Sequence, residues 1–263
     1  MIAILVSIAI IACLSYFIFR KKRVITPISD NLVKTYSGIL EKEVSFYQKL
    51  DQQGKAKFET LVVQFLENTT IEGVGTEVTA LDRTLIASSA VIPIYGFPGW
   101  RYQNLTNVVL YPDTFNSEFQ FEGGSRNIMG MVGSGFMNGQ MLLSRAALIQ
   151  GFSSSSGKEN AAIHEFVHLL DKSDGATDGV PENLLPHEYA TPWLKMMHEE
   201  MQDIEQGHSD INPYAITNEA EFLAVASEYF FEKPEKFEKM HPELYQMLSR
   251  IYAQDPNKNI ADV

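Results

Sequence analysis

The sequence predicts an α+β fold that is mostly helical with a small mixed sheet, preceded by one transmembrane helix. Apolar residues recur at helical spacing over residues 38–68 and again after residue 159, and two short runs of strand character lie between them. Helices that come before and after one small sheet along the chain indicate an α+β domain rather than a repeating βαβ unit. The chain divides into an anchor with a basic collar (1–23), a tether (24–37) and one folded domain (38–263).

The composition limits the possible function. The chain has 263 residues, 45% of them hydrophobic, which is enough for a sizeable core. Its formal net charge is −12, so no nucleic-acid partner is expected. The single cysteine, Cys13, lies in the apolar N-terminal run. A disulfide, a cysteine zinc site and a cysteine nucleophile are therefore excluded from the domain, and a zinc site there must use histidines and carboxylates.

The N-terminal run predicts a membrane anchor. Residues 2–19 carry no charge and, at about 1.5 Å rise per residue, span roughly 27 Å as a helix. Four basic residues follow at positions 20–23, whereas a cleaved signal peptide would begin with basic residues. The positive-inside rule places this collar and the following domain in the cytoplasm. A lipoprotein signal at Cys13 is the alternative, but the apolar run continues through Phe19.

Helices are expected in the first part of the domain. The apolar spacing over residues 38–68 predicts two helices broken near Gly54, because glycine weakens a helix interior. Residues 77–93 are rich in small apolar residues and predict a buried helix that ends before Pro93.

Strands are expected in the middle of the chain. Residues 107–111 form one, stopped by Pro112, and residues 139–144 form the second. Residues 113–135, rich in Gly, Ser and Asn, are expected to be a loop or an irregular hairpin. After Glu159 the chain is expected to be helical except in loops at 172–191 and 205–217.

One motif carries chemistry. His164, Glu165 and His168 form the pattern His-Glu-x-x-His. Histidines four residues apart share one helix face at about 5–6 Å and can bind one ion, while the glutamate can take a proton from a water molecule at that ion. The pattern also arises by chance, but here the neighbouring residues are apolar. Burying these polar groups without a shared ligand would cost several kcal/mol, which favours a metal site. A capping box at residues 156–159 predicts the start of the helix.

The third ligand is not decided by spacing. A catalytic zinc takes three protein ligands. Residues 218–231 predict a helix on which Glu221 and Glu228 share one stripe. Glu221 could instead bond the backbone as part of a capping box with Asn218. Glu228 or Asp171 could be the carboxylate that orients a ligand histidine.

Several blocks in this order resemble the Mlc titration factor A family of zinc metallopeptidases. They are residues 164–171, 178–181 and 221–231, with residues 105–112 and 139–144 fitting as well. The catalytic part of this family is similar to the anthrax lethal factor peptidase domain, and both carry a tyrosine seven residues before the ligand glutamate. Here Tyr214 stands seven residues before Glu221.

This resemblance implies a zincin-like metallopeptidase domain of gluzincin type over residues 38–263. It implies that one Zn²⁺ is bound by His164, His168 and Glu221, with Glu165 as general base and Tyr214 as oxyanion stabiliser. It also implies a peptide or protein substrate. The alternative from the family name is a binding protein that sequesters a transcriptional repressor.

The chain departs in two ways from the proteins that it resembles. Familiar family members are soluble cytoplasmic proteins, whereas the N-terminal run of this chain predicts single-pass attachment to the bacterial inner membrane with the domain in the cytoplasm. The toxin has an acid four residues after its ligand glutamate, where this chain has Val225. The identity of the carboxylate that orients a ligand histidine therefore stays open between Asp171 and Glu228.

Residues 141–144 are expected to be an edge strand that pairs with extended substrate, the alternative being a buried strand.

Overall fold

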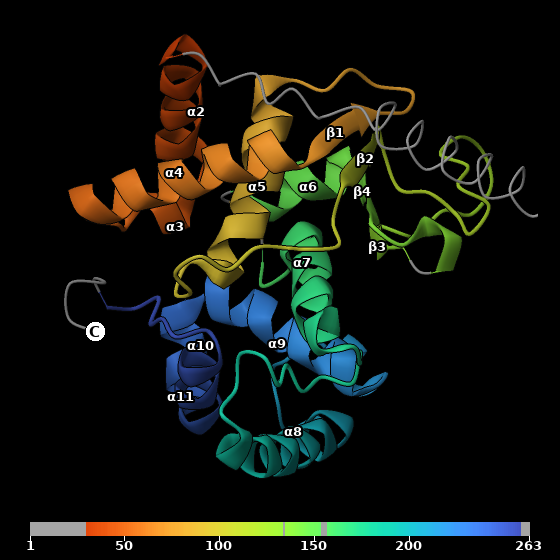
Figure 1. Ribbon diagram of the computed structural model, residues 1–263. Coiled ribbons are helices and arrows are strands. Elements are labelled where there is room, and N and C mark those ends of the chain that lie inside the picture. The colour runs from red at the N-terminus through yellow and green to blue at the C-terminus, as the bar shows by residue number, and fades with distance from the viewer. Residues whose placement is uncertain (1–29, 134, 154–156, 259–263) are drawn as a thin grey trace, which may run out of the picture.

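The computed structural model describes residues 30–258 apart from residue 134 and residues 154–156. Within this part of the chain no helix is long and apolar enough to cross a membrane. The expected anchor at residues 1–23 lies outside the described residues. Four helices precede or follow the first strand in the N-terminal part (Figure 1): α2 (Asp30–Glu43), α3 (Ser45–Gln48), α4 (Gln52–Asn68) and α5 (Ala80–Ile94).

The helix boundaries of the N-terminal part differ from the sequence expectation at three places. α2 begins at Asp30 and buries Tyr36 and Leu40, so the second half of the segment expected as a tether is helical. The break expected near Gly54 lies earlier, because the Asp51 side chain caps α4 by accepting from the Gly54 amide at 2.6 Å.

Pro93 does not end the preceding helix. It lies inside the last turn of α5, where a proline removes only one helical hydrogen bond. Thr79 and Asp82 start this helix with a reciprocal capping box.

The sheet is mixed, as expected, and has four strands in the order β1-β2-β4-β3. The strands are β1 (Thr70–Gly73), β2 (Asn107–Tyr111), β3 (Gly130–Val132) and β4 (Gln140–Ser144). β1, β2 and β4 are parallel, and β3 pairs antiparallel with β4. β2 and β4 match the two predicted strands. The sequence does not predict β1, because Ile71 is the one buried residue of this strand and gives no alternating pattern.

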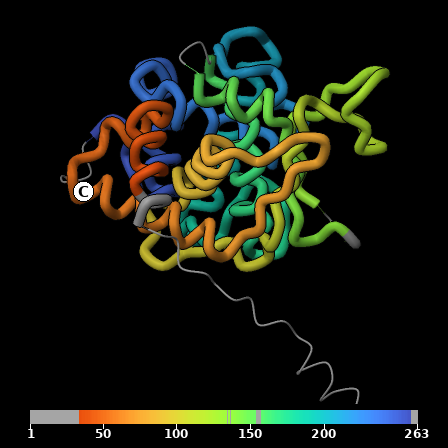
Figure 2. Tube along the Cα trace, turned by 90° about the horizontal axis from the view of Figure 1, so that it is seen from above, coloured from red at the N-terminus to blue at the C-terminus, as the bar shows by residue number. Residues whose placement is uncertain are grey.

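This strand order corrects one expectation. β4 lies between β2 and β3, so it is not an edge strand and has no free side for a substrate. The edge strand on this side of the sheet is β3, within the segment expected to be irregular, and β1 is the other edge strand. Figure 2 shows the chain between β2 and β4 projecting from the body. The base of this projection buries the small cluster of Tyr111, Phe115 and Leu142.

The C-terminal half is helical. Its helices are α6 (Arg145–Gly151), α7 (Ala161–Asp171), α8 (Ala190–Glu205), α9 (Glu219–Glu232), α10 (Pro234–Met240) and α11 (Pro242–Ile251). α7 lies at the centre of the molecule, between the part that carries the sheet and the part that carries α8 and α9 (Figure 1). It buries Phe166 and Val167 in the main core, which also takes Trp193 and Phe222. This burial fixes the helix that carries the His-Glu-x-x-His motif.

α7 starts later than the capping box predicts. Residues 157–160 are not helical, and Ser156 lies outside the described residues. The cap is Asn160, whose side chain accepts from the Ile163 amide at 3.2 Å.

Candidate metal centre

α7 presents both motif histidines on one face. The ring centroids of His164 and His168 are 4.7 Å apart, and their Nε2 atoms are 3.0 Å apart. This is the i, i+4 geometry that the spacing predicts.

Glu221 reaches the two rings from α9. Its Oε2 lies 2.9 Å from Nε2 of His164 and 3.5 Å from Nε2 of His168. Around a tetrahedral zinc with bonds of about 2.0–2.1 Å, ligand atoms stand roughly 3.3 Å apart. The Glu221 oxygen is buried and makes no hydrogen bond of good geometry with the described chain. Two imidazoles and one carboxylate converging in this way fit a zinc ion. Asn218 caps α9, and its side chain accepts from the amide of Glu221.

Glu228 is the carboxylate that contacts a motif histidine. Its Oε1 lies 2.7 Å from Nδ1 of His164, and its Oε2 accepts from the Asn160 amide at 2.5 Å. A carboxylate on the far nitrogen fixes the tautomer and the ring orientation of a ligand histidine. Asp171, the other candidate, instead accepts from the Gly179 amide at 2.9 Å.

Charge is concentrated around the two rings. Burial alone would lower the pKa of His164, but the close carboxylates of Glu221 and Glu228 raise it to about 10. Burial would raise the pKa of Glu221, but His164 and His168 lower it to about 2. Without a metal, a protonated imidazole therefore supplies the positive charge. The same carboxylates would stabilise a divalent cation in its place.

Glu165 lies beside the candidate ligands in a different environment. Its side chain is buried, and burial raises its pKa, an effect that the two histidines oppose. The backbone of β3 packs directly against it, since a Cβ at Gly130 would stand 2.6 Å from its Cγ. A raised pKa makes a carboxylate a stronger base, which favours a group that accepts a proton and returns it.

Tyr214 stands at the rim of the site, in the short 3-10 helix η4 (Pro213–Ile216). Its ring centroid is 6.2 Å from that of His164, and its side chain is about half exposed. Burial and the neighbouring acids Glu221 and Glu165 raise the pKa of its hydroxyl, which keeps it a proton donor at neutral pH.

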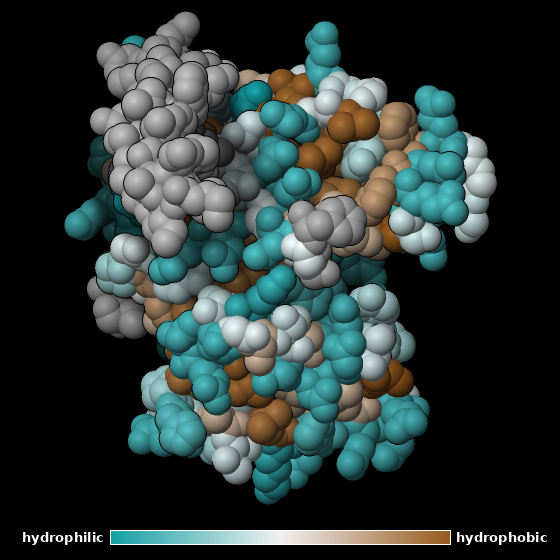
Figure 3. Space-filling model, turned by 45° about the vertical axis from the view of Figure 1, so that its right-hand side comes forward, coloured by the Kyte–Doolittle hydropathy of each residue, from teal (hydrophilic) through white to brown (hydrophobic). Residues whose placement is uncertain are grey.

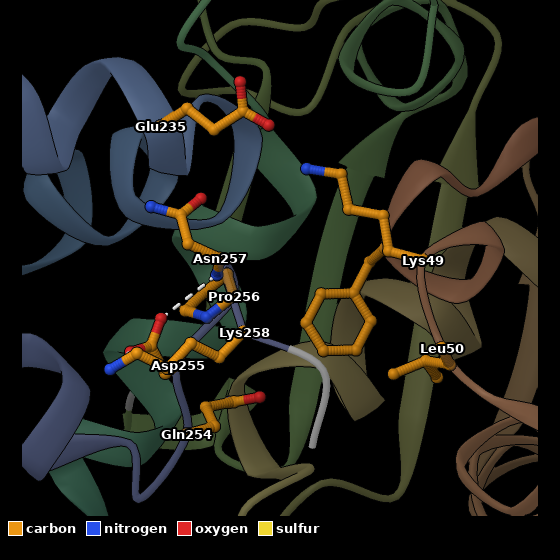
Figure 4. Close-up of a pocket in the computed structure, with 9 residues that line it drawn as sticks. Lys49, Leu50, Glu235, Gln254, Asp255, Pro256, Asn257 and Lys258 are labelled. Atoms are coloured by element: carbon orange, nitrogen blue, oxygen red, sulfur yellow. Dashed lines mark hydrogen bonds and ion pairs between the residues drawn. The ribbon is translucent and has the colours of Figure 1, made fainter. Parts of the chain in front are cut away.

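Four of these side chains face one cleft of about 560 Å³. His164, Glu165, Tyr214 and Glu228 line it together with Gly130 at the start of β3. The molecule is hollowed at mid-height between its two parts, as Figure 3 shows. A smaller cavity of about 290 Å³, between Lys49 and Leu50 at the end of α3 and residues 254–258, contains none of the motif residues (Figure 4).

Sequence reasoning missed Asn160 and Glu232. The Asn160 side chain donates to Glu232 at 2.8 Å, while its amide bonds Glu228. One residue thus caps α7 and ties the start of that helix to α9. An asparagine just before the motif helix was the available signal, but its partners lie about 70 residues away in the sequence.

Comparisons with known proteins identify the family. The family described as glucose-regulated metallo-peptidase M90 matches residues 17–253. An uncharacterized protein of Synechocystis sp. is 28% identical over 84% of each chain. Mlc titration factor A of Salmonella agona is 29% identical over 80% of this chain and 83% of its own, and that of Klebsiella pneumoniae is 29% identical over 78% and 81%. The resemblance to the Mlc titration factor A proteins is confirmed, and the chain belongs to the glucose-regulated metallo-peptidase M90 family.

Proposed function

We propose that this protein is a zinc-dependent peptidase of the gluzincin type. The observation that carries the proposal is the convergence of His164, His168 and Glu221 on one point, with a buried carboxyl, Glu165, beside it. When bound, zinc supplies a Lewis acid for the peptide carbonyl and lowers the pKa of a coordinated water to near 7.

The chain's own residues would perform the proton transfers. Glu165 takes a proton from the attacking water and returns it to the leaving amine. The Tyr214 hydroxyl donates a hydrogen bond to the carbonyl oxygen as negative charge develops there. Glu228 holds His164 in the tautomer that leaves its Nε2 lone pair free for the metal.

The free edge of β3 supports a peptide substrate. Its backbone begins against Glu165 at Gly130, and one of its sides is unpaired within the described sheet. An extended peptide can add to such an edge by main-chain hydrogen bonds, which places its own carbonyls beside the base.

A second candidate function comes from the relatives' name. Proteins called Mlc titration factor A are 29% identical to this chain over most of its length. We therefore consider a binding protein that sequesters a transcriptional repressor, with hydrolysis secondary. We also propose that residues 1–23 hold either activity at the inner membrane, a prediction that fractionation of the full chain against a chain lacking these residues tests.

One substitution separates the two functions. If the protein is a peptidase, the Glu165→Gln variant keeps its zinc and loses turnover. If the protein acts by sequestering a repressor, the same variant still binds the repressor. His168→Ala loses zinc, and His198→Ala, an exposed histidine on α8, is the control that keeps it. Zinc is measured by metal analysis of the purified full-length protein, and turnover with a mixed peptide library. Undiminished hydrolysis by the Glu165→Gln protein would disprove the proposed mechanism.

A further inference from the structure

A second large cavity lies at the other end of β3 from Gly130. It has a volume of about 620 Å³ and is bounded by the loop before β2, the turn between β3 and β4, and the end of α7. Arg101 and Lys172 line it, and no Asp or Glu of the described chain does. In a protein with net charge −12, a cavity with two cations and no acid is unexpected. We call this cavity the basic pocket.

The two cations of the basic pocket have no carboxylate partner. Within the described residues neither Arg101 nor Lys172 forms an ion pair; the Lys172 ammonium only approaches the Gly133 carbonyl oxygen at 3.5 Å. The amides of Asn138 and Asn183 lie in the same wall. Cations and amide donors together form a site for a carboxylate.

Away from the metal ligands, the cleft at the candidate metal centre is lined by acids. Glu159, Glu165 and Glu228 line it, and its one described lysine, Lys158, is already paired with Asp210 at 2.7 Å. A substrate acid that lies beyond the metal therefore meets no unpaired lysine or arginine of the described chain in this cleft and is attracted to the basic pocket.

β3 connects the two cavities. Gly130 lies against Glu165, and the Gly133 carbonyl lies beside Lys172. Three residues of strand span roughly 10 Å, and the seven residues of helix from Glu165 to Lys172 also span roughly 10 Å. The strand and α7 therefore run side by side in the same direction. A peptide on the free edge of β3 with its scissile bond at Glu165 would reach the basic pocket about three residues later.

We propose that the basic pocket is a substrate subsite that binds an acidic side chain about three residues from the scissile bond. This inference rests on the proposed peptidase function and names its substrate class: peptides or protein segments that carry an acid at that distance. Arg101 and Lys172 determine the preference.

The test compares Asp with Asn, which has the same shape and no charge, at each position on both sides of the scissile bond in a peptide library. The full-length zinc protein is expected to favour Asp about fivefold at one position some three residues from the bond, since each exposed ion pair contributes a factor of about 2–5. In Arg101→Gln and Lys172→Gln the Asp/Asn ratio falls toward one. Lys239→Gln, which removes an exposed cation from α10, keeps the ratio.

A binding measurement separates failure of this inference from failure of the proposed function. Labelled Asp and Asn peptides are titrated into the Glu165→Gln protein, where no turnover is needed. Tighter binding of the Asp peptide that weakens with salt and disappears in Lys172→Gln supports the basic pocket even if no peptide is cleaved. Equal binding of the two peptides, or an Asp preference that survives both substitutions, overturns the inference. Binding of inorganic phosphate without an Asp preference overturns it as well.

Discussion

Replacing Glu228 with Gln tests whether the carboxylate behind His164 supports the metal. The carboxylate has two partners, His164 Nδ1 at 2.7 Å and the Asn160 amide at 2.5 Å. Glutamine keeps the shape but removes the charge and replaces one acceptor oxygen with a donor. It can keep both contacts only if His164 moves its proton to Nε2, which removes the lone pair that a metal needs. Loss of such an outer partner costs about 10–100-fold in metal affinity, or about 1.4–2.7 kcal/mol.

The assay is a competition titration of zinc against a chromophoric chelator at pH 7.5. Glu232→Gln is the matched control, because Glu232 stands one turn further along α9 and bonds the Asn160 side chain instead of a histidine. We expect Glu228→Gln to weaken zinc binding at least tenfold and Glu232→Gln to change it less than threefold. If both proteins bind zinc as the parent does, or if both lose it equally, Glu228 does not support the metal through His164.

Three further predictions follow from single contacts. Gly179→Ala places a Cβ 2.3 Å from the Glu219 carbonyl oxygen at φ +76°. It should lower the free energy of unfolding by about 1–3 kcal/mol or more, and it should weaken zinc binding because it displaces the start of α9. Gly207→Ala, at φ +75° in open space, is the control that should show the backbone strain without the loss of zinc affinity. Calorimetry and the zinc titration check both, and equal zinc affinity in the two variants would contradict the contact. Tyr214→Phe should lower kcat about 100–1000-fold at unchanged zinc content, and a decrease below threefold in steady-state assays would remove the hydroxyl from the chemistry. Burial raises the pKa of Glu232 from 4.5 to about 7. Between pH 4.5 and pH 7 the folded state therefore holds a proton that the unfolded state has lost. The free energy of unfolding should fall by up to about 3 kcal/mol as the pH rises through this range. Glu232→Gln should remove this decrease in urea unfolding at pH 5 and pH 8, and a parallel pH dependence in both proteins would refute the assignment.

Much of the domain follows from local pattern. The strands at β2 and β4 and the helices α7, α8 and α9 coincide with runs whose periodicity is strong. β1 and β3 were not recognised, because three- and four-residue strands with few buried side chains have no periodic signal. The helix break placed at Gly54 and the helix end placed before Pro93 were wrong, since an aspartate cap outweighs a glycine and a last turn tolerates a proline.

The sequence by itself determined the half of the candidate site that lies within one helix. Residues four apart on a helix must share a face, so the mutual position of His164 and His168 needs no other part of the chain. Only the tertiary structure brought Glu221 within 2.9 Å of His164, put Glu228 rather than Asp171 on its ring, and made β3 instead of β4 the sheet edge. These features depend on how α9 and the sheet pack against α7 and on which strands pair. Contacts between segments that are separate in the sequence are set by the shared core, which no local pattern encodes.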